Sequence, residues 1–135
     1  MPLRTAVITV LLLVATSARA QTHEMNADTC DVKKAEQKML SVYNQILEEY
    51  ASDKVFVGNL QASQQAWLTY RDAQIKALYP HTERGYYGSV LPMCECVKLT
   101  YYTNERIKDL KQWLDGIEEG DVCIGSIKMI KRSVQ

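Results

Sequence analysis

The chain has 135 residues with 16 basic and 16 acidic side chains, and 47% of its residues are hydrophobic. The balanced charge gives no reason to expect nucleic acid as a partner, because proteins that bind it concentrate basic residues. The length is enough for one domain with its own core.

The first 20 residues have the three parts of a secretory signal peptide. Arg4 supplies the positive start, residues 6–15 are apolar except for Thr9, and residues 18–20 (Ala-Arg-Ala) match a cleavage site. We therefore predict cleavage before Gln21. A membrane anchor is the alternative, but the apolar run is about half of the ~20 residues that a spanning helix needs. No other segment is apolar enough to span a bilayer.

Removal of this signal leaves residues 21–135 as a single domain, which we expect to be periplasmic or secreted. Arg4 and Arg19 leave with the signal, so 14 basic side chains remain against 16 acidic ones and the net charge is near −2. This charge favours a cationic protein partner only mildly.

A first helix is predicted from about Lys33 to Tyr50. Apolar side chains recur there at spacings of three and four, as on the buried face of an amphipathic helix. The stripe comprises Ala35, Met39, Val42, Ile46 and Tyr50, widened by Tyr43 and Leu47. Its start has three candidate capping residues, which are Asp28, Thr29 and Asp31.

A second helix is predicted from the capping pair Ser52-Asp53 to about Tyr79, where Pro80 ends it. Gly58 costs about 1 kcal/mol relative to alanine, so the helix could instead start there. One stripe comprises Leu60, Gln64, Trp67, Arg71, Gln74 and Leu78. A neighbouring stripe is rich in small residues that would let another helix approach closely, and it comprises Ala66, Tyr70, Ala73 and Ala77.

Residues 80–89 have the composition of a loop, and a third helix follows them. Ser89 is its predicted cap, Pro92 is tolerated in its first turn, and it continues to about Leu114. Its stripe comprises Leu99, Tyr102, Arg106, Leu110 and Trp113. The tail after residue 121 has too little pattern for a prediction. Three helices with short connections predict an all-α, antiparallel helical bundle.

Four cysteines lie in the mature chain: Cys30, Cys94, Cys96 and Cys123. An even number in a small exported domain predicts two disulfides, for which three connectivities are possible. Cys94 and Cys96 lie about 200° apart around a helix, so we expect them to tie two different elements to it. A zinc site is the alternative, because C-x-C occurs in metal sites, but neither His23 nor His81 is at ligand spacing.

No motif for catalysis stands out. His81 lies in a loop without the pattern of a general base, and it would need a buried carboxylate beside it. The pairs Glu48-Glu49 and Glu118-Glu119 are typical of a solvated surface, and no glycine-rich phosphate loop is present. We therefore predict no enzymatic activity, no metal and no cofactor.

Polar side chains interrupt the apolar stripes of the second and third helices. Gln64, Trp67 and Arg71 share one helix face, and Arg106 lies on the stripe of the third helix. A charged group at a helix interface needs hydrogen-bond partners, for which Asp72 and Gln64 are candidates. The arginines either tie the loop between the helices to the bundle or support that loop against a partner.

Residues 64–74 (QQAWLTYRDAQ) and a second block of residues 88–93 (GSVLPM) and 103–106 (TNER) resemble the two main motifs of the LprI-type lysozyme-inhibitor family. Residues 39–43 are similar to the weaker first block of this family. Residues 120–123 are similar to the ending found in one branch of it. The resemblance covers a core over about 30–126. The matching motif residues, with structural or partner-supporting roles, are Gln64, Trp67, Tyr70, Arg71, Asp72, Gly88, Ser89, Thr103, Arg106 and Leu110.

This resemblance implies a small exported helical domain that binds a cell-wall hydrolase and protects peptidoglycan. The most suitable contact element is the loop of residues 81–89, which has glycines for bending. Tyr86 and Tyr87 offer contact area, and Arg84 offers a partner for a carboxylate. The alternative is an envelope protein-interaction module with a non-lysozyme partner and no catalytic activity, because a shared domain does not carry activity with it.

The resemblance also implies a disulfide pairing. Family members often have a cysteine after the arginine-aspartate motif, paired with one in the third helix. Ile75 and about Lys98 occupy those positions here, which is what the loss of one disulfide would leave. A bond between Cys94 and Cys123 would replace it, and Cys30 would then pair with Cys96.

Overall fold

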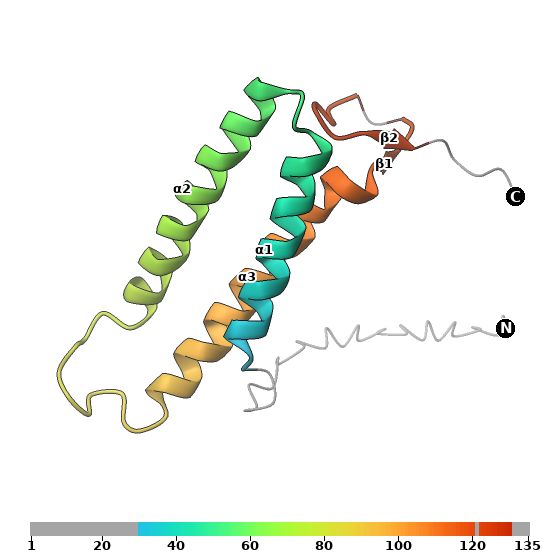
Figure 1. Ribbon diagram of the computed structural model, residues 1–135. Helices are drawn as coiled ribbons and strands as arrows, with labels where there is room; N and C mark the ends of the chain where they lie inside the picture. Colours follow the sequence, from blue (N-terminus) through green and yellow to red (C-terminus); the bar gives the residue numbers. More distant parts are fainter. Residues whose placement is uncertain (1–29, 121, 131–135) are drawn as a thin grey trace, which may run out of the picture.

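Three helices account for most of the structure, a computed structural model that describes residues 30–120 and 122–130. They are α1 (Val32–Glu49), α2 (Lys54–Leu78) and α3 (Leu91–Asp115). α1 and α3 lie side by side and run in the same direction, and α2 runs antiparallel to both (Figure 1). The predicted all-α helical bundle is confirmed. The predicted signal peptide lies outside the described residues, within which no helix combines the length and apolar character needed to cross a membrane.

Aspartates begin the first two helices, and each was among the candidates that the sequence offered. The carboxylate of Asp31 accepts the backbone N–H of Lys34 at 3.0 Å, and that of Asp53 accepts the N–H of Phe56 at 2.9 Å. Each bond satisfies an N–H group that has no partner within the helix. α2 therefore begins at Lys54 and not at the glycine four residues later.

The start of α3 differs from the prediction. Val90 is the residue before the first turn, and no side chain caps the helix. Ser89 lies one residue too early because it forms a turn with Val90, so its predicted capping role is wrong. Pro92 lies in the first turn as expected, where its missing N–H has no cost.

The core lies between α1 and α3, with the first half of α2 against them. The predicted stripe of α1 is buried at Ala35, Met39, Val42 and Ile46. α3 buries Leu110 and Arg106 of its predicted stripe and also a second set of side chains that was not predicted, which comprises Val97, Thr100, Thr103 and Ile107. α3 has two buried sets because helices pack against it on two sides.

α2 contacts the bundle mainly through its first half. Its buried residues are Phe56, Leu60 and Gln64, and Trp67 is half-buried. The small-residue stripe is exposed, so its predicted close approach to another helix is wrong; its members are Ala66, Tyr70, Ala73 and Ala77. α2 packs through the neighbouring stripe, and no described helix covers this one.

Two short strands follow the bundle. β1 (Ile117–Glu118) and β2 (Met129–Ile130) pair in parallel, with Ile117 opposite Met129. The indole N–H of Trp113 donates to the hydroxyl of Ser126 at 3.0 Å, which fixes the segment between the strands to α3. The sequence did not predict this pairing, because two-residue strands carry no periodicity.

Gly116 makes the turn from α3 into β1. Its φ is +78°, and an added Cβ atom would lie 2.9 Å from the carbonyl oxygen of Lys128 and from a methyl group of Ile130. Both the backbone conformation and the close approach therefore require glycine. Lys128, the residue before β2, also forms an ion pair with Glu49 at 2.7 Å, which joins this part of the chain to the end of α1.

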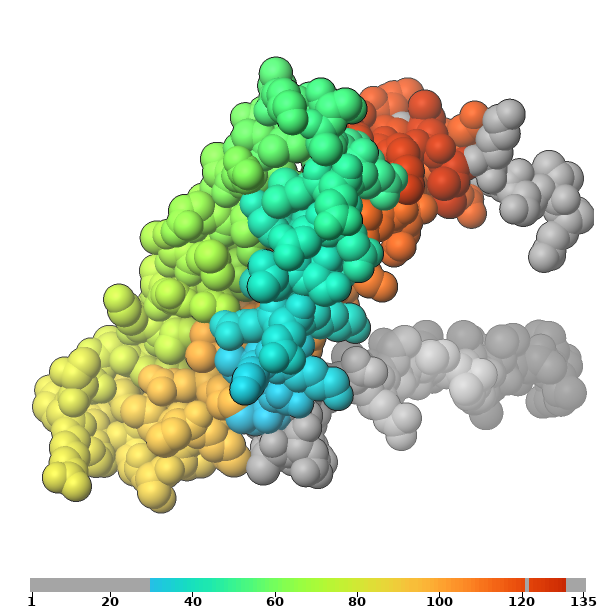
Figure 2. Space-filling model, viewed as in Figure 1, coloured from blue at the N-terminus to red at the C-terminus, as the bar shows by residue number. Residues whose placement is uncertain are grey.

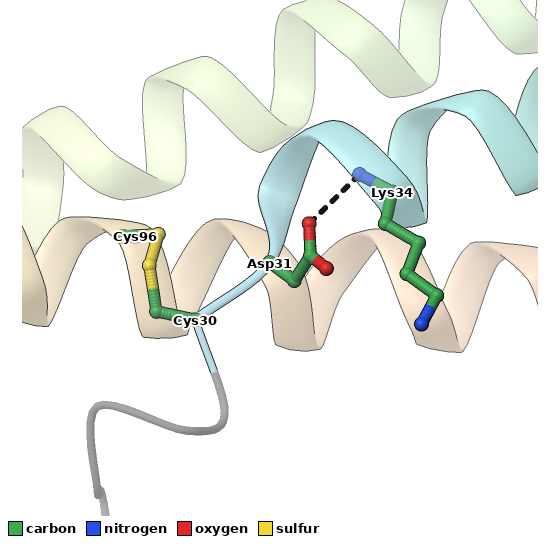
Figure 3. The surroundings of a disulfide bond; sticks show 4 residues. All are labelled: Cys30, Asp31, Lys34 and Cys96. Carbon is green, nitrogen blue, oxygen red and sulfur yellow. Dashed lines mark hydrogen bonds between the residues drawn. A yellow bond between two sulfur atoms is a disulfide. The ribbon is translucent and has the colours of Figure 1, made fainter.

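A disulfide joins the start of α1 to the start of α3. It links Cys30 and Cys96, whose Cα atoms are 5.4 Å apart, and Cys30 directly precedes the capping residue of α1 (Figure 3). This confirms the pairing that the family resemblance implies. It also removes both cysteines as thiolate ligands for zinc.

The second implied disulfide is wrong. Cys94 is a free thiol in the first turn of α3, whereas Cys123 lies beyond the other end of that helix. A helix of 25 residues is about 38 Å long. The two cysteines are therefore held at opposite ends of the bundle, far beyond the Cα separation that a disulfide allows.

Candidate partner-binding surface

An aromatic cluster organises residues 80–90, hereafter the aromatic loop, which connects α2 to α3. The rings of His81 and Tyr86 stack with centroids 4.1 Å apart, and Tyr87 lies edge-on to Tyr86 at 4.8 Å and to Tyr79 at 5.5 Å. The backbone N–H of His81 also donates to the hydroxyl of Tyr87 at 3.3 Å. These contacts hold the loop in one shape at the end of the molecule remote from the strands (Figure 1).

Two glycines shape the backbone of the aromatic loop. Gly85 and Gly88 have φ values of +85° and +72°, which glycine adopts without strain. The N–H of Tyr86 donates to the carbonyl of Glu83 at 3.1 Å, and that of Gly88 to the carbonyl of Gly85 at 3.0 Å. The two bonds close consecutive turns, which place residues 84–86 at the exposed surface.

The aromatic loop presents Arg84 and Tyr86 to solvent. Tyr86 is 60% exposed although its ring stacks on His81, and Arg84 is exposed. Tyr87 is half-buried in the cluster, so it supports the loop more than it offers contact area. In Figure 2 the loop forms a projecting corner of the molecule. A guanidinium beside an amphipathic ring suits a protein surface that carries carboxylates.

The predicted motif residues Gln64 and Arg106 meet between α2 and α3. Arg106 donates from Nε to Oε1 of Gln64 and from Nη2 to the hydroxyl of Ser63, both at 3.1 Å. Gln64 is buried and donates in turn to the sulfur of Met39 at 3.5 Å. Burial lowers the pKa of Arg106, and the charge of Asp109 opposes this shift. An arginine remains protonated at neutral pH.

Arg71 makes a second link, between α2 and α1. Its guanidinium pairs with Glu36 at 2.8 Å and with Asp72 at 3.0 Å. The guanidinium carbons of Arg71 and Arg106 lie 5.4 and 6.0 Å from the centre of the Trp67 ring, within the range of cation–π attraction. The bond from Arg71 to Glu36 joins α2 to α1, and the bonds from Arg106 join α3 to α2. One interpretation of the sequence expected the arginines to tie the aromatic loop to the bundle, and these bonds do not do so.

The remaining motif residues have separate positions. Thr103 and Leu110 are fully buried in α3. Tyr70 is exposed, and its hydroxyl accepts a hydrogen bond from Gln74 at 3.0 Å. Gly88 and Ser89 lie in the aromatic loop. The motif therefore divides between helix packing and the loop, except for Tyr70, which lies on the exposed face of α2.

Sequence reasoning missed several partners of these residues. Glu36 and Ser63 receive hydrogen bonds from the arginines, and Tyr79 and His81 belong to the aromatic cluster. The available signal was position: each lies beside a residue that the patterns had singled out. Only the fold shows which of these neighbours reaches an arginine or an aromatic ring.

The surroundings of His81 differ from those that a general base needs. The closest carboxylate that pairs with His81 is Glu83 at 3.7 Å, and both side chains are largely exposed. The buried carboxylate that a general base would need is therefore not supplied by Glu83. Among the described residues, no three His, Cys, Asp or Glu side chains gather into a possible metal site.

The fold and the geometry define the class of protein. It is a helical domain with a disulfide and with arginines that join its helices. The chain belongs to the LprI family: the model of that family, described as lysozyme inhibitor LprI, matches residues 15–110. The match includes the aromatic loop and both arginines and ends at Leu110, so it does not reach residues 120–123, whose resemblance to one branch of the family stays a prediction. Neither the curated proteins nor the solved structures gave a match.

Proposed function

We propose that the mature protein acts outside the cytoplasm as a lysozyme-inhibitor-like protein, which binds a cell-wall hydrolase and so protects peptidoglycan. Membership of the LprI family over residues 15–110 carries this proposal. The disulfide supports export, because such bonds persist in oxidising compartments. The protein acts by binding and not by catalysis.

The aromatic loop is the contact element in this proposal. Its ring contacts and turns order it before binding, which reduces the entropy lost on association. Lysozymes act through two carboxylates in a cleft. Arg84 pairs with carboxylates at or near that cleft, and Tyr86 packs at its mouth.

A lysozyme turbidity assay tests the proposal with three purified mature proteins. The loop variant combines Arg84→Ala with Tyr86→Ala. The control combines Lys54→Ala with Val55→Ala, which also removes one basic and one exposed apolar side chain, at the opposite end of α2. We expect the parent and the control to inhibit, and the loop variant to bind about 30-fold less tightly, as the loss of about 2 kcal/mol at a contact hot spot predicts.

The outcomes separate the two parts of the proposal. Equal inhibition by all three proteins would remove the aromatic loop as the contact element. No inhibition by the parent would leave the alternative, an envelope interaction module with a non-lysozyme partner. A pull-down from envelope extract then distinguishes the two functions. A lysozyme-like hydrolase as the main partner supports the inhibitor, and an unrelated envelope protein supports the interaction module.

A further inference from the structure

A groove runs along α3 on the flank that faces away from α2. It has a volume of about 1080 Å³ and extends from Val97 to Lys111, which is about 21 Å along the helix. Arg106 contacts α2, and Lys108, two residues later, lies about 200° around the helix from it. Lys38 of α1 forms the other wall. The groove is therefore separate from the arginine links to α2.

The groove concentrates positive charge in a chain that is neutral overall. Four of the ten lysines of the chain line it, and these are Lys38, Lys98, Lys108 and Lys111. Glu105 is the single acidic residue among its lining residues, and it pairs with Lys108 at 2.6 Å. The remaining three ammonium groups give the groove a net positive charge that invites an acidic occupant.

The floor of the groove adds two further features. Val97 and Ile107 are buried apolar residues that line it, so the floor can accept apolar side chains. Thr100 also lines it and is 8% exposed, and its buried hydroxyl has no hydrogen-bond partner within the described part of the chain. A buried hydroxyl without a partner is destabilising, and a polar group of an occupant could relieve it.

We propose that this groove binds an acidic amphipathic segment of a partner protein. Apolar side chains of that segment pack on Val97 and Ile107, and its carboxylates pair with Lys38, Lys98 and Lys111. An elongated apolar floor with charged walls is the arrangement by which grooves accept amphipathic helices. The site lies on a different face from the aromatic loop and does not depend on the proposed lysozyme inhibition.

Fluorescence anisotropy tests this with the full mature protein and a labelled 18-residue helical peptide, which has leucines on one face and glutamates on both flanks. We expect binding that weakens as sodium chloride rises, because salt screens exposed charges. Lys98→Glu with Lys111→Glu is expected to weaken binding about tenfold or more. Lys54→Glu with Lys76→Glu makes the same charge change on α2 and is expected to leave binding unchanged.

Three results would overturn the proposal. The first is equal binding of a peptide in which glutamine replaces every glutamate, because charge would then play no part. The second is equally tight binding of heparin, which would make the groove a site for anionic glycans. The third is equal loss of binding in both charge variants. Circular dichroism confirms that each variant is folded, and the salt series on the parent protein tests the charge requirement without any substitution.

Discussion

Arg106 and Arg71 carry the same charge in different surroundings. Arg106 is buried, and its two hydrogen-bond acceptors, Gln64 and Ser63, are neutral. Arg71 is largely buried too, but its acceptors are the half-exposed carboxylates of Glu36 and Asp72. Water can replace Arg71 as a partner for these carboxylates, whereas the amide of Gln64 is buried and loses its charged hydrogen-bond donor with Arg106.

Alanine substitutions should therefore separate the two arginines. We expect Arg106→Ala to lower the free energy of unfolding by about 3 kcal/mol, because Gln64 loses its partner and the packed stem is removed. Arg71→Ala should cost less, about 1 kcal/mol, because the carboxylates of Glu36 and Asp72 are half-exposed and remain hydrated without it. Urea unfolding followed by circular dichroism measures both. Similar losses of unfolding free energy in the two variants would show that burial does not make Arg106 more important for stability than Arg71.

The elements differ in how far their sequences predicted them. α1 packs along one side, so a single stripe of spacing three and four predicted its buried face. α3 packs on two sides, and half of its second buried set is threonine, which hydrophobic periodicity does not register. The candidate capping residues of the sequence included the aspartates that begin α1 and α2, whereas α3 has no side-chain cap to predict.

Two glycine-to-alanine substitutions should have opposite effects on the elements that contain them. Gly116→Ala combines a left-handed φ with a 2.9 Å approach to Lys128 and Ile130, so we expect a loss of about 1–3 kcal/mol. Gly58→Ala lies within α2 in open space and should stabilise by up to about 1 kcal/mol. Thermal unfolding measures both, and faster hydrogen exchange at residues 117–130 should accompany the first. Equal melting temperatures would contradict this account.

At the scale of the molecule, the bundle is fixed at both ends. The disulfide joins the starts of α1 and α3, and the hydroxyl of Tyr50 donates to the carbonyl of Trp113 at 3.1 Å near their ends. The fold class followed from periodicity and loop lengths, and the Cys30–Cys96 pair from family resemblance. The Cys94–Cys123 pair, which also came from the resemblance, failed because α3 separates the two cysteines by most of its length.

Loss of the disulfide should destabilise the whole bundle, because the bond spans 66 residues of sequence and so restricts a long stretch of the unfolded chain. The chain-entropy estimate for a loop of this size is about 4 kcal/mol. We expect Cys30→Ser with Cys96→Ser to lower the unfolding free energy by up to that amount, and reductant to do the same to the parent. Cys94→Ser is the control, because its thiol is free and its removal should leave the response to reductant intact. A Cys94→Ser protein whose stability no longer responds to reductant would mean that a bond to Cys94, and not the one between the helix starts, holds the molecule together.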